Sequence, residues 1–329
     1  LMGLIEIIPK IPMLISRIKL TANSIISQNP DVLITIDSPD FCMRVAKKVR
    51  NALPNLKIIH YVAPSVWAWR PERAAKMSKY VDHVLALLPF EPPYMEAEGM
   101  TCDFVGHPAV SSPHVSKKAQ EKFKKKYNLH NGPIITVLPG SRIGEIKRMC
   151  PIFNKVLNNI EKLYPDSQFI LPVASSVEKD VVNAVKSWNI KPLLLLNEGK
   201  DLKELEHDKF ITYSISSAAL ATSGTVSLEL AAKKCPMIVA YKANWITTKM
   251  VKKLAKIDTA NLINIITDTK VIPEHLFENC TVENITESLR SLLNNDNNQI
   301  KAMEETMNRL GADRKDIHLL AANSVLNNI

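Results

Sequence analysis

The chain has 329 residues, 46% of them hydrophobic and 23% charged, which is the composition of an ordinary globular protein and excludes a disordered one. This length exceeds one ordinary compact core, so two domains with a cleft between them are expected. The net charge of +9 favours anionic partners such as phosphorylated ligands, nucleic acid or an acidic membrane face.

The five cysteines are scattered, odd in number and never arranged as C-x-x-C, so neither a zinc site nor a disulfide framework is predicted. Such thiols are typical of a reducing compartment, and we expect the cytoplasm. Charged residues and prolines interrupt the apolar start of the chain, which contains no run near the roughly twenty residues of a membrane span. The chain opens on Leu1 inside an apolar helical pattern without a cap, which we interpret as a cut edge.

Short β-branched runs alternate with helical patterns, which predicts βαβ units and mostly parallel sheets. The predicted strands form two groups of four and hence two doubly wound sheets: Val32–Ile36, Lys57–Tyr61, His83–Leu87 and Asp103–Val105, then Ile134–Leu138, Gln168–Leu171, Leu193–Leu196 and Met237–Ala240. A polar stretch near Ala109 to Pro113 reads as the linker. The expected domains are therefore residues 1–110 and 111–312, with a terminal helix in 313–329 that packs back on the first.

The first candidate site follows the first strand. Asp37 and Asp40 come directly after Val32–Ile36, at the carboxyl end of a parallel strand, where open α/β sheets bind their ligands. The alternative is that Asp37 caps the next helix and Pro39 starts it.

Two of the chain's four tryptophans, Trp67 and Trp69, share one loop with Arg70 and Arg73 behind them. Flat rings beside a cleft suit a sugar or an acyl chain, and together with Asp40 and Phe41 they would form an acceptor side. The alternative is that they plug a domain interface.

In the second half, Ile134–Leu138 leads into Gly140, Ser141 and Arg142 before a helix. A glycine lets the backbone approach a ligand, a helix N-terminus offers N–H groups to an anion, and Arg142 adds a fork suited to phosphate oxygens. A capped turn whose arginine faces solvent is the alternative. The spacing excludes a Walker loop.

A second small-residue turn contains Ser223, Gly224 and Thr225 and opens another helix. Glu229 lies one turn deeper than Thr225 on the same helical face, where a carboxylate could bind ribose hydroxyls of a nucleotide whose diphosphate lies at the turn. A simple capped helix is the alternative.

Two helix N-termini suited to binding an anion lie in one lobe, and a loop that carries carboxylates lies in the other. This combination fits glycosyl transfer from a nucleotide-sugar, since the leaving diphosphate needs hydrogen-bond donors and the attacking hydroxyl needs a base. No D-x-D-like pair lies on the donor lobe, so neither a metal nor another cofactor is expected. The segment Trp245–Ile257 predicts a basic amphipathic helix that rests on an anionic membrane or packs inward.

Several motifs together resemble one family, the lipid-A-disaccharide synthases. They are His60–Arg70, Leu88–Glu91, Val105–Pro108, Leu138–Arg142, Ser223–Thr225 and Val271–Glu274, in this order.

The resemblance implies an inverting transferase with two Rossmann-like lobes of the GT-B type. It would join UDP-2,3-diacylglucosamine to 2,3-diacylglucosamine 1-phosphate, releasing UDP. By similarity Asp37 is the general base, and Arg142 is an essential donor-site residue. Gly140, Ser141, Ser223, Gly224, Thr225, Glu229 and Asn264 fall in the nucleotide-binding segments. Expected partners are these two substrates and the inner face of the inner membrane, with a homodimer as a further possibility and no nucleic acid.

The resemblance also implies that the family's amino-terminal strand–loop–helix unit has no counterpart here, so the first lobe is incomplete and apolar edges are exposed. Two alternatives remain open. One is another enzyme of this fold that uses UDP-N-acetylglucosamine, against which the tryptophan loop and Asp37 argue. The other is a non-catalytic remnant that binds UDP-sugar or a membrane surface.

Overall fold

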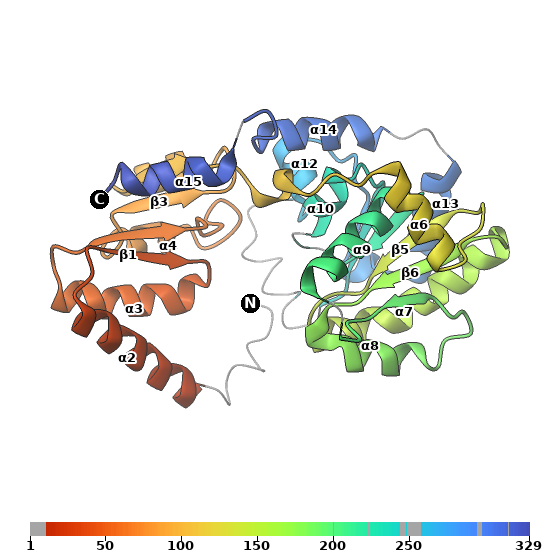
Figure 1. Cartoon of the computed structure of the whole chain (residues 1–329), viewed down its shortest axis with the longest axis horizontal. Helices are drawn as coiled ribbons and strands as arrows, with labels where there is room; N and C mark the ends of the chain where they lie inside the picture. Colours follow the sequence, from red (N-terminus) through yellow and green to blue (C-terminus); the bar gives the residue numbers. More distant parts are fainter. Residues whose placement is uncertain are drawn as a thin grey trace. The chain divides into compact units, whose positions relative to one another are not determined.

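The structure is a computed structural model that describes residues 11–199, 201–222, 224, 226–243, 248, 258–294, 298–314 and 316–329. The chain forms two compact units (Figure 1). Unit 1 consists of the described residues up to Val110, Asp258 and the returning segment Arg309–Ile329. Unit 2 consists of the described residues of Ser111–Thr248 and Thr259–Asn308.

Unit 1 has a four-stranded parallel sheet in the order β1-β2-β3-β4. Its elements are α2 (Ile11–Gln28), β1 (Val32–Ile36), α3 (Pro39–Ala52), β2 (Lys57–Tyr61), α4 (Glu72–Met77), β3 (His83–Ala86), α5 (Pro92–Glu96), β4 (Thr101–Phe104), η2 (Pro108–Ser111) and α15 (Ile317–Leu326).

Helices cover both faces of this sheet. Figure 1 shows α2 and α3 on one side and α15 on the other. The first side holds the larger core, which includes Val45, Val49 and Ile58. On the second side, Ala321 and Val325 of α15 pack on Ile59, Leu85 and Val105.

The edge strand β1 presents an apolar row to solvent. Ile34 and Ile36 are 42% and 62% exposed, whereas Leu33 and Thr35, which alternate with them, are buried. Side chains alternate along a strand, so both isoleucines share the face that α15 covers further into the sheet. The sequence-based expectation of an exposed apolar edge is met at β1.

Unit 2 has a six-stranded parallel sheet in the order β10-β9-β8-β5-β6-β7. Its elements are α6 (Lys117–Lys126), β5 (Ile134–Leu138), α7 (Ile143–Leu163), β6 (Gln168–Pro172), η3 (Ser175–Val177), α8 (Glu178–Val185), β7 (Leu193–Leu195), α9 (Leu202–Ile215), β8 (Ala218–Ala221), α10 (Val226–Ala232), β9 (Met237–Tyr241), α12 (Leu262–Thr267), β10 (Glu274–Leu276), η4 (Phe277–Asn279), α13 (Val282–Asn294) and α14 (Gln299–Arg309).

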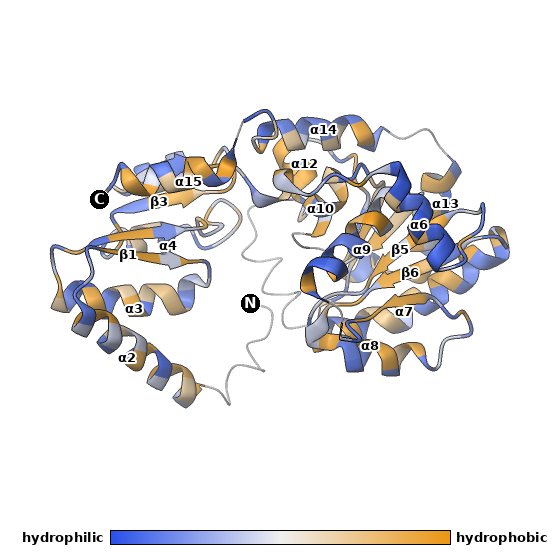
Figure 2. Ribbon diagram, viewed as in Figure 1, coloured by the Kyte–Doolittle hydropathy of each residue, from blue (hydrophilic) through white to orange (hydrophobic). Residues whose placement is uncertain are grey.

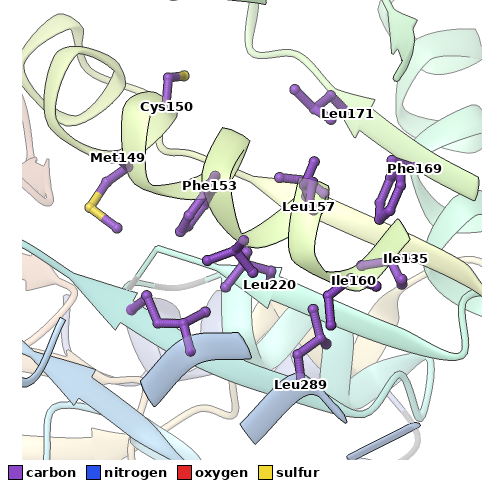
Figure 3. Close-up of a cluster of buried hydrophobic side chains, with 14 of the residues drawn as sticks. Ile135, Met149, Cys150, Phe153, Leu157, Ile160, Phe169, Leu171, Leu220 and Leu289 are labelled. Carbon is purple, nitrogen blue, oxygen red and sulfur yellow. The ribbon is translucent and has the colours of Figure 1, made fainter. Parts of the chain in front are cut away.

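The core of unit 2 lies between the sheet and the long helix α7. Figure 3 shows Phe153, Leu157 and Ile160 of α7 directed at the strands that carry Ile135 and Leu220. The central strands are mostly apolar in Figure 2, as expected for parallel strands covered on both faces.

The chain direction reverses in unit 2 between β5 and β8. From β5 the chain moves outward through β6 and β7, and it then returns to the other side of β5 as β8. The crevice at such a switch point, at the carboxyl ends of the strands, is where doubly wound sheets bind ligands. In the described part of unit 1, the strands follow in chain order.

Two sequence-based predictions about the strands are wrong. The second sheet has six strands, because Ala218–Ala221 and Glu274–Leu276 also form strands. Five predicted strands also differ by one or two residues from their observed limits, as with β4, which begins at Thr101 and ends at Phe104.

Candidate functional site

The loop after β1 gives Asp37 an unusual backbone. Asp37 and Ser38 have φ angles of 51° and 43°, a left-handed conformation that costs free energy for residues with a Cβ. The interpretation of Asp37 as the cap of the next helix is wrong, because the N-cap of α3 is Ser38 and it makes no side-chain cap hydrogen bond. The interpretation of Pro39 as the first helical residue is confirmed. The carboxylate of Asp37 is therefore exposed at the carboxyl end of β1.

Left-handed residues other than glycine gather at this end of the sheet. Besides Asp37 and Ser38, Val62 after β2 has a φ of 82° and Arg70 in the tryptophan loop has a φ of 52°. A β-branched residue such as Val62 rarely adopts this conformation. Because such strain persists mainly where the surrounding structure enforces it for function, its concentration here marks a candidate site.

A neutral histidine lies beside Asp37. His60 on β2 is fully buried, and its Nδ1 lies 2.8 Å from Thr35 Oγ1. Burial lowers the pKa of its imidazole to about 4, against the opposing effect of Asp37. Its Nε2 finds no hydrogen-bond partner among the described residues.

The tryptophan loop is anchored inside unit 1. Trp67 meets Phe90 edge to face at 5.2 Å, and its Nε1 donates to Glu91 Oε1 at 3.2 Å. Glu91 is 3% exposed and also accepts from the N–H groups of Leu87 and Leu88. Burial raises the pKa of Glu91 to about 7, although these hydrogen bonds lower it.

The ring of Trp69 instead contacts two cationic side chains. The guanidinium groups of Arg70 and Arg73 lie 4.3 and 5.0 Å from its ring centroid. Arg73 also donates to both carboxylate oxygens of Asp40, at 3.1 and 2.9 Å. Phe41 lies on the core side, half-buried against the larger core of unit 1.

In unit 2, a buried carboxylate shapes the loop after β5. Glu145 accepts from Ser141 N and from Arg142 Nη1, both at 2.9 Å. Gly140 has a φ of 119°, and a Cβ there would lie 2.5 Å from Glu145 Oε2. The side chain of Arg142 is 55% exposed, so this fork is oriented by Glu145 and still open to an anion.

The loop after β8 lies beside the loop after β5, because the two strands pair and Thr222 N donates to Leu138 O at 2.9 Å. Gly224 is exposed with open space around it. Glu229 in α10 pairs with Lys209 Nζ at 3.0 Å. Ser223 and Thr225 lie outside the described residues, as does most of Trp245–Ile257.

Asn264 has a structural role in α12. Its Nδ2 donates to Ile272 O at 2.9 Å and its Oδ1 accepts from Ile272 N at 3.0 Å. These two hydrogen bonds tie α12 to the segment that precedes β10. Asn264 is 2% exposed. Its place in nucleotide binding stays a prediction.

The structure thus brings Gly140, Ser141, Arg142 and Gly224 together at the switch point of unit 2, while Asp37 and Asp40 belong to unit 1. Sequence reasoning missed the buried carboxylates Glu145 and Glu91. The position of Glu145 in the first turn of α7 was visible, but its burial depends on tertiary contacts.

Comparisons with known proteins show the family of the chain. A family profile described as "Lipid-A-disaccharide synthetase" matches residues 1–326. The chain belongs to the lipid-A-disaccharide synthase family. It is 44% identical over 329 residues to a lipid-A-disaccharide synthase of Ruegeria pomeroyi, covering 100% of this chain and 82% of that protein. A relative of the same name from Rhodospirillum centenum is 38% identical over 331 residues, with 99% and 80% covered.

The fold is shared more widely. A UDP-GlcNAc 2-epimerase of Neisseria meningitidis, solved bound to UDP-GlcNAc, has a TM-score of 0.61 at 13% identity, covering 94% of this chain and 80% of that one. This likeness shows the fold alone, that of GT-B glycosyltransferases and their relatives. Family membership makes the chain a glycosyltransferase of lipid A biosynthesis. No helix in the described ranges is long and apolar enough to cross a membrane.

Proposed function

We propose that the chain transfers 2,3-diacylglucosamine from UDP to the hydroxyl of 2,3-diacylglucosamine 1-phosphate, giving the disaccharide 1-phosphate and UDP. The observation that carries the proposal is Asp37, an exposed carboxylate held in a strained loop at the ligand-binding edge of unit 1 and unused as a helix cap.

Unit 2 would bind the donor. The loops after β5 and β8 flank the switch point, and the first turn of α7 has N–H groups without intrahelical partners. Arg142, oriented by Glu145, would take the charge that develops on the leaving diphosphate. Gly140 and Ser141 would allow close approach to it, together with Ser223, Gly224 and Thr225, and Glu229 would bind the ribose.

Unit 1 would supply the base. Asp37 accepts the proton of the acceptor hydroxyl as that oxygen bonds to the anomeric carbon and the bond from this carbon to UDP breaks. Inversion needs only one protein carboxylate, because the acceptor hydroxyl takes the place that water has in inverting hydrolases and the diphosphate leaves as an anion that needs no proton from a general acid. His60 is neutral near physiological pH and would add no competing positive charge beside Asp37.

The diacyl substrates are lipids, so we place the enzyme at the inner face of the inner membrane, bound peripherally. The net charge of +9 and the lysines of Trp245–Ile257 support attraction to anionic lipid. A homodimer stays a prediction that none of the contacts within one chain addresses.

The test is a transfer assay with both diacyl substrates in neutral detergent micelles, without added metal. The proposal expects disaccharide 1-phosphate and UDP in equal amounts. Folded protein that binds UDP but forms no disaccharide would contradict the proposal and favour a non-catalytic binding role.

A further inference from the structure

A basic cavity lies next to the proposed acceptor site, wholly within unit 1. Its volume is about 240 Å³, and it lies between the start of α3 and the segment that runs from the tryptophan loop into α4. Pro39 and Asp40 line it, so it begins two residues beyond Asp37. A ligand that fills it would therefore extend from the base.

Cationic side chains outnumber carboxylates in the lining of the cavity. Four cations line it, Arg44, Arg70, Arg73 and Lys76, against two carboxylates, Asp40 and Glu72. The excess of two positive charges matches a phosphate monoester, which carries up to two negative charges at neutral pH.

Internal contacts use only part of this charge. Arg73 forms an ion pair with Asp40. Arg70 lies on the ring of Trp69, a contact that orients the guanidinium group but leaves its positive charge unneutralised. Arg44 and Lys76 form no ion pair with any carboxylate that the structure describes. Unpaired cations that converge on a cavity are the arrangement that binds phosphate oxygens.

We propose that this cavity binds the phosphate of the sugar acceptor, with Arg44, Arg70 and Lys76 as its ligands and the Arg73–Asp40 pair as its wall. This inference rests on the proposed function, because it requires a phosphorylated acceptor whose hydroxyl reaches Asp37. With the phosphate in the cavity and the hydroxyl at Asp37, the sugar ring would lie between them, and only one hydroxyl would face the base.

The experiment compares two acceptors, 2,3-diacylglucosamine 1-phosphate and unphosphorylated 2,3-diacylglucosamine, in neutral detergent micelles. Both the acceptor KM and the equilibrium binding of each acceptor are measured. Arg44→Ala and Lys76→Ala should each raise the KM for the phosphorylated acceptor about tenfold or more, since each removes a charge-assisted contact. The KM for the unphosphorylated acceptor and the affinity for UDP should stay within about twofold.

Matched controls are Lys48→Ala on α3 and Lys79→Ala just after α4, which remove the same charge from exposed positions outside the cavity. They should behave as the unaltered chain. Equal losses for both acceptors, or controls that match the cavity variants, would overturn the inference. So would a loss confined to binding of phosphatidylglycerol vesicles, which would make the cavity a membrane headgroup site.

The binding arm separates this inference from the proposed function. If the chain forms no disaccharide but binds the phosphorylated acceptor preferentially, and Arg44→Ala removes that preference, the cavity is confirmed and the transferase proposal fails. If disaccharide forms without any preference for the phosphorylated acceptor, the transferase proposal stands and the cavity inference fails.

Discussion

At the level of single residues, two buried carboxylates hold the loops of the candidate sites in place. Glu145 binds Ser141 N and Arg142, and Glu91 binds Trp67 and two main-chain N–H groups. Burying a carboxylate destabilises the folded state unless hydrogen bonds compensate for the lost hydration. Losing the hydrogen bonds that fix either loop would therefore lower the stability of the protein.

Gly140→Ala tests the close approach of the loop after β5 to Glu145. The added Cβ would lie 2.5 Å from Glu145 Oε2 on a backbone with a φ of 119°, so the loop or Glu145 must move. We expect the free energy of unfolding to fall by about 1–3 kcal/mol and the UDP affinity to fall about tenfold or more. Chemical denaturation and calorimetric UDP titration measure both.

Gly199→Ala is the matched control for Gly140→Ala. Gly199 also has a positive φ, of 78°, but nothing lies within 4 Å of its added Cβ. This variant should lose about 1–2 kcal/mol from backbone strain and keep its UDP affinity. Unchanged UDP affinity in Gly140→Ala would show that the loop does not bind the nucleotide.

Glu91 makes stability depend on pH. Its pKa is about 7 in the folded chain, raised by burial from an ordinary value of 4.5. Between these values the folded state binds more protons than the unfolded state, so the stabilisation present below pH 4.5 is lost as pH rises through 7, by up to about 3 kcal/mol.

The difference in unfolding free energy between the unaltered chain and Glu91→Gln, measured by denaturation from pH 4.5 to 8, tests this assignment. The unaltered chain should lose stability relative to the variant as pH rises. A difference that is constant with pH would show that Glu91 does not titrate in this range.

Residue roles were only partly predictable from the sequence. The positions of Asp37, Arg142 and Trp67 after their strands could be read from the strand pattern. The left-handed backbone that removes Asp37 from the cap, and the burial of Glu91, arise from tertiary contacts that no local pattern encodes.

At the level of elements, the C-terminal helix α15 is fastened to the sheet of unit 1. Ser324 Oγ bonds His83 Nε2 at 2.8 Å and Asp103 Oδ2 at 2.6 Å. Gly106 makes the approach possible, because a Cβ there would lie 2.7 Å from Ile317 Cγ2. Segments more than two hundred residues apart in the chain therefore pack together in unit 1.

Ser324→Ala tests this fastening. It leaves the buried His83 Nε2 without its hydroxyl partner, so we expect the free energy of unfolding to fall by about 1–3 kcal/mol. Asn323→Ala, at the exposed neighbouring position of α15, should change it by less than about 0.5 kcal/mol. Equal effects of the two substitutions in thermal denaturation would contradict the role of Ser324.

Strands rich in β-branched residues were predictable, whereas two others were not. Ala218–Ala221 reads Ala-Ala-Leu-Ala, and alanine is the strongest helix former, yet the segment is fully buried between β5 and β9. Three-residue β10 is too short for a periodic signal. Tertiary burial decided both elements against local propensity.

For the molecule as a whole, each unit has its own core and its own set of candidate residues. The switch point and Arg142 belong to unit 2, and Asp37 and the basic cavity belong to unit 1. The family match covers both units, so the proposed reaction divides donor binding and proton removal between two separately built sheets.

The most direct test of this division is one measurement on Asp37→Asn, turnover and UDP affinity together, beside Asp31→Asn. Asp31 precedes β1 and is exposed at the opposite end of this strand. Asp31→Asn therefore removes the same charge at a position away from the site. We predict that Asp37→Asn lowers kcat about a hundredfold to ten-thousandfold with UDP affinity unchanged, and that Asp31→Asn changes neither. Turnover in Asp37→Asn equal to that of Asp31→Asn would contradict the account.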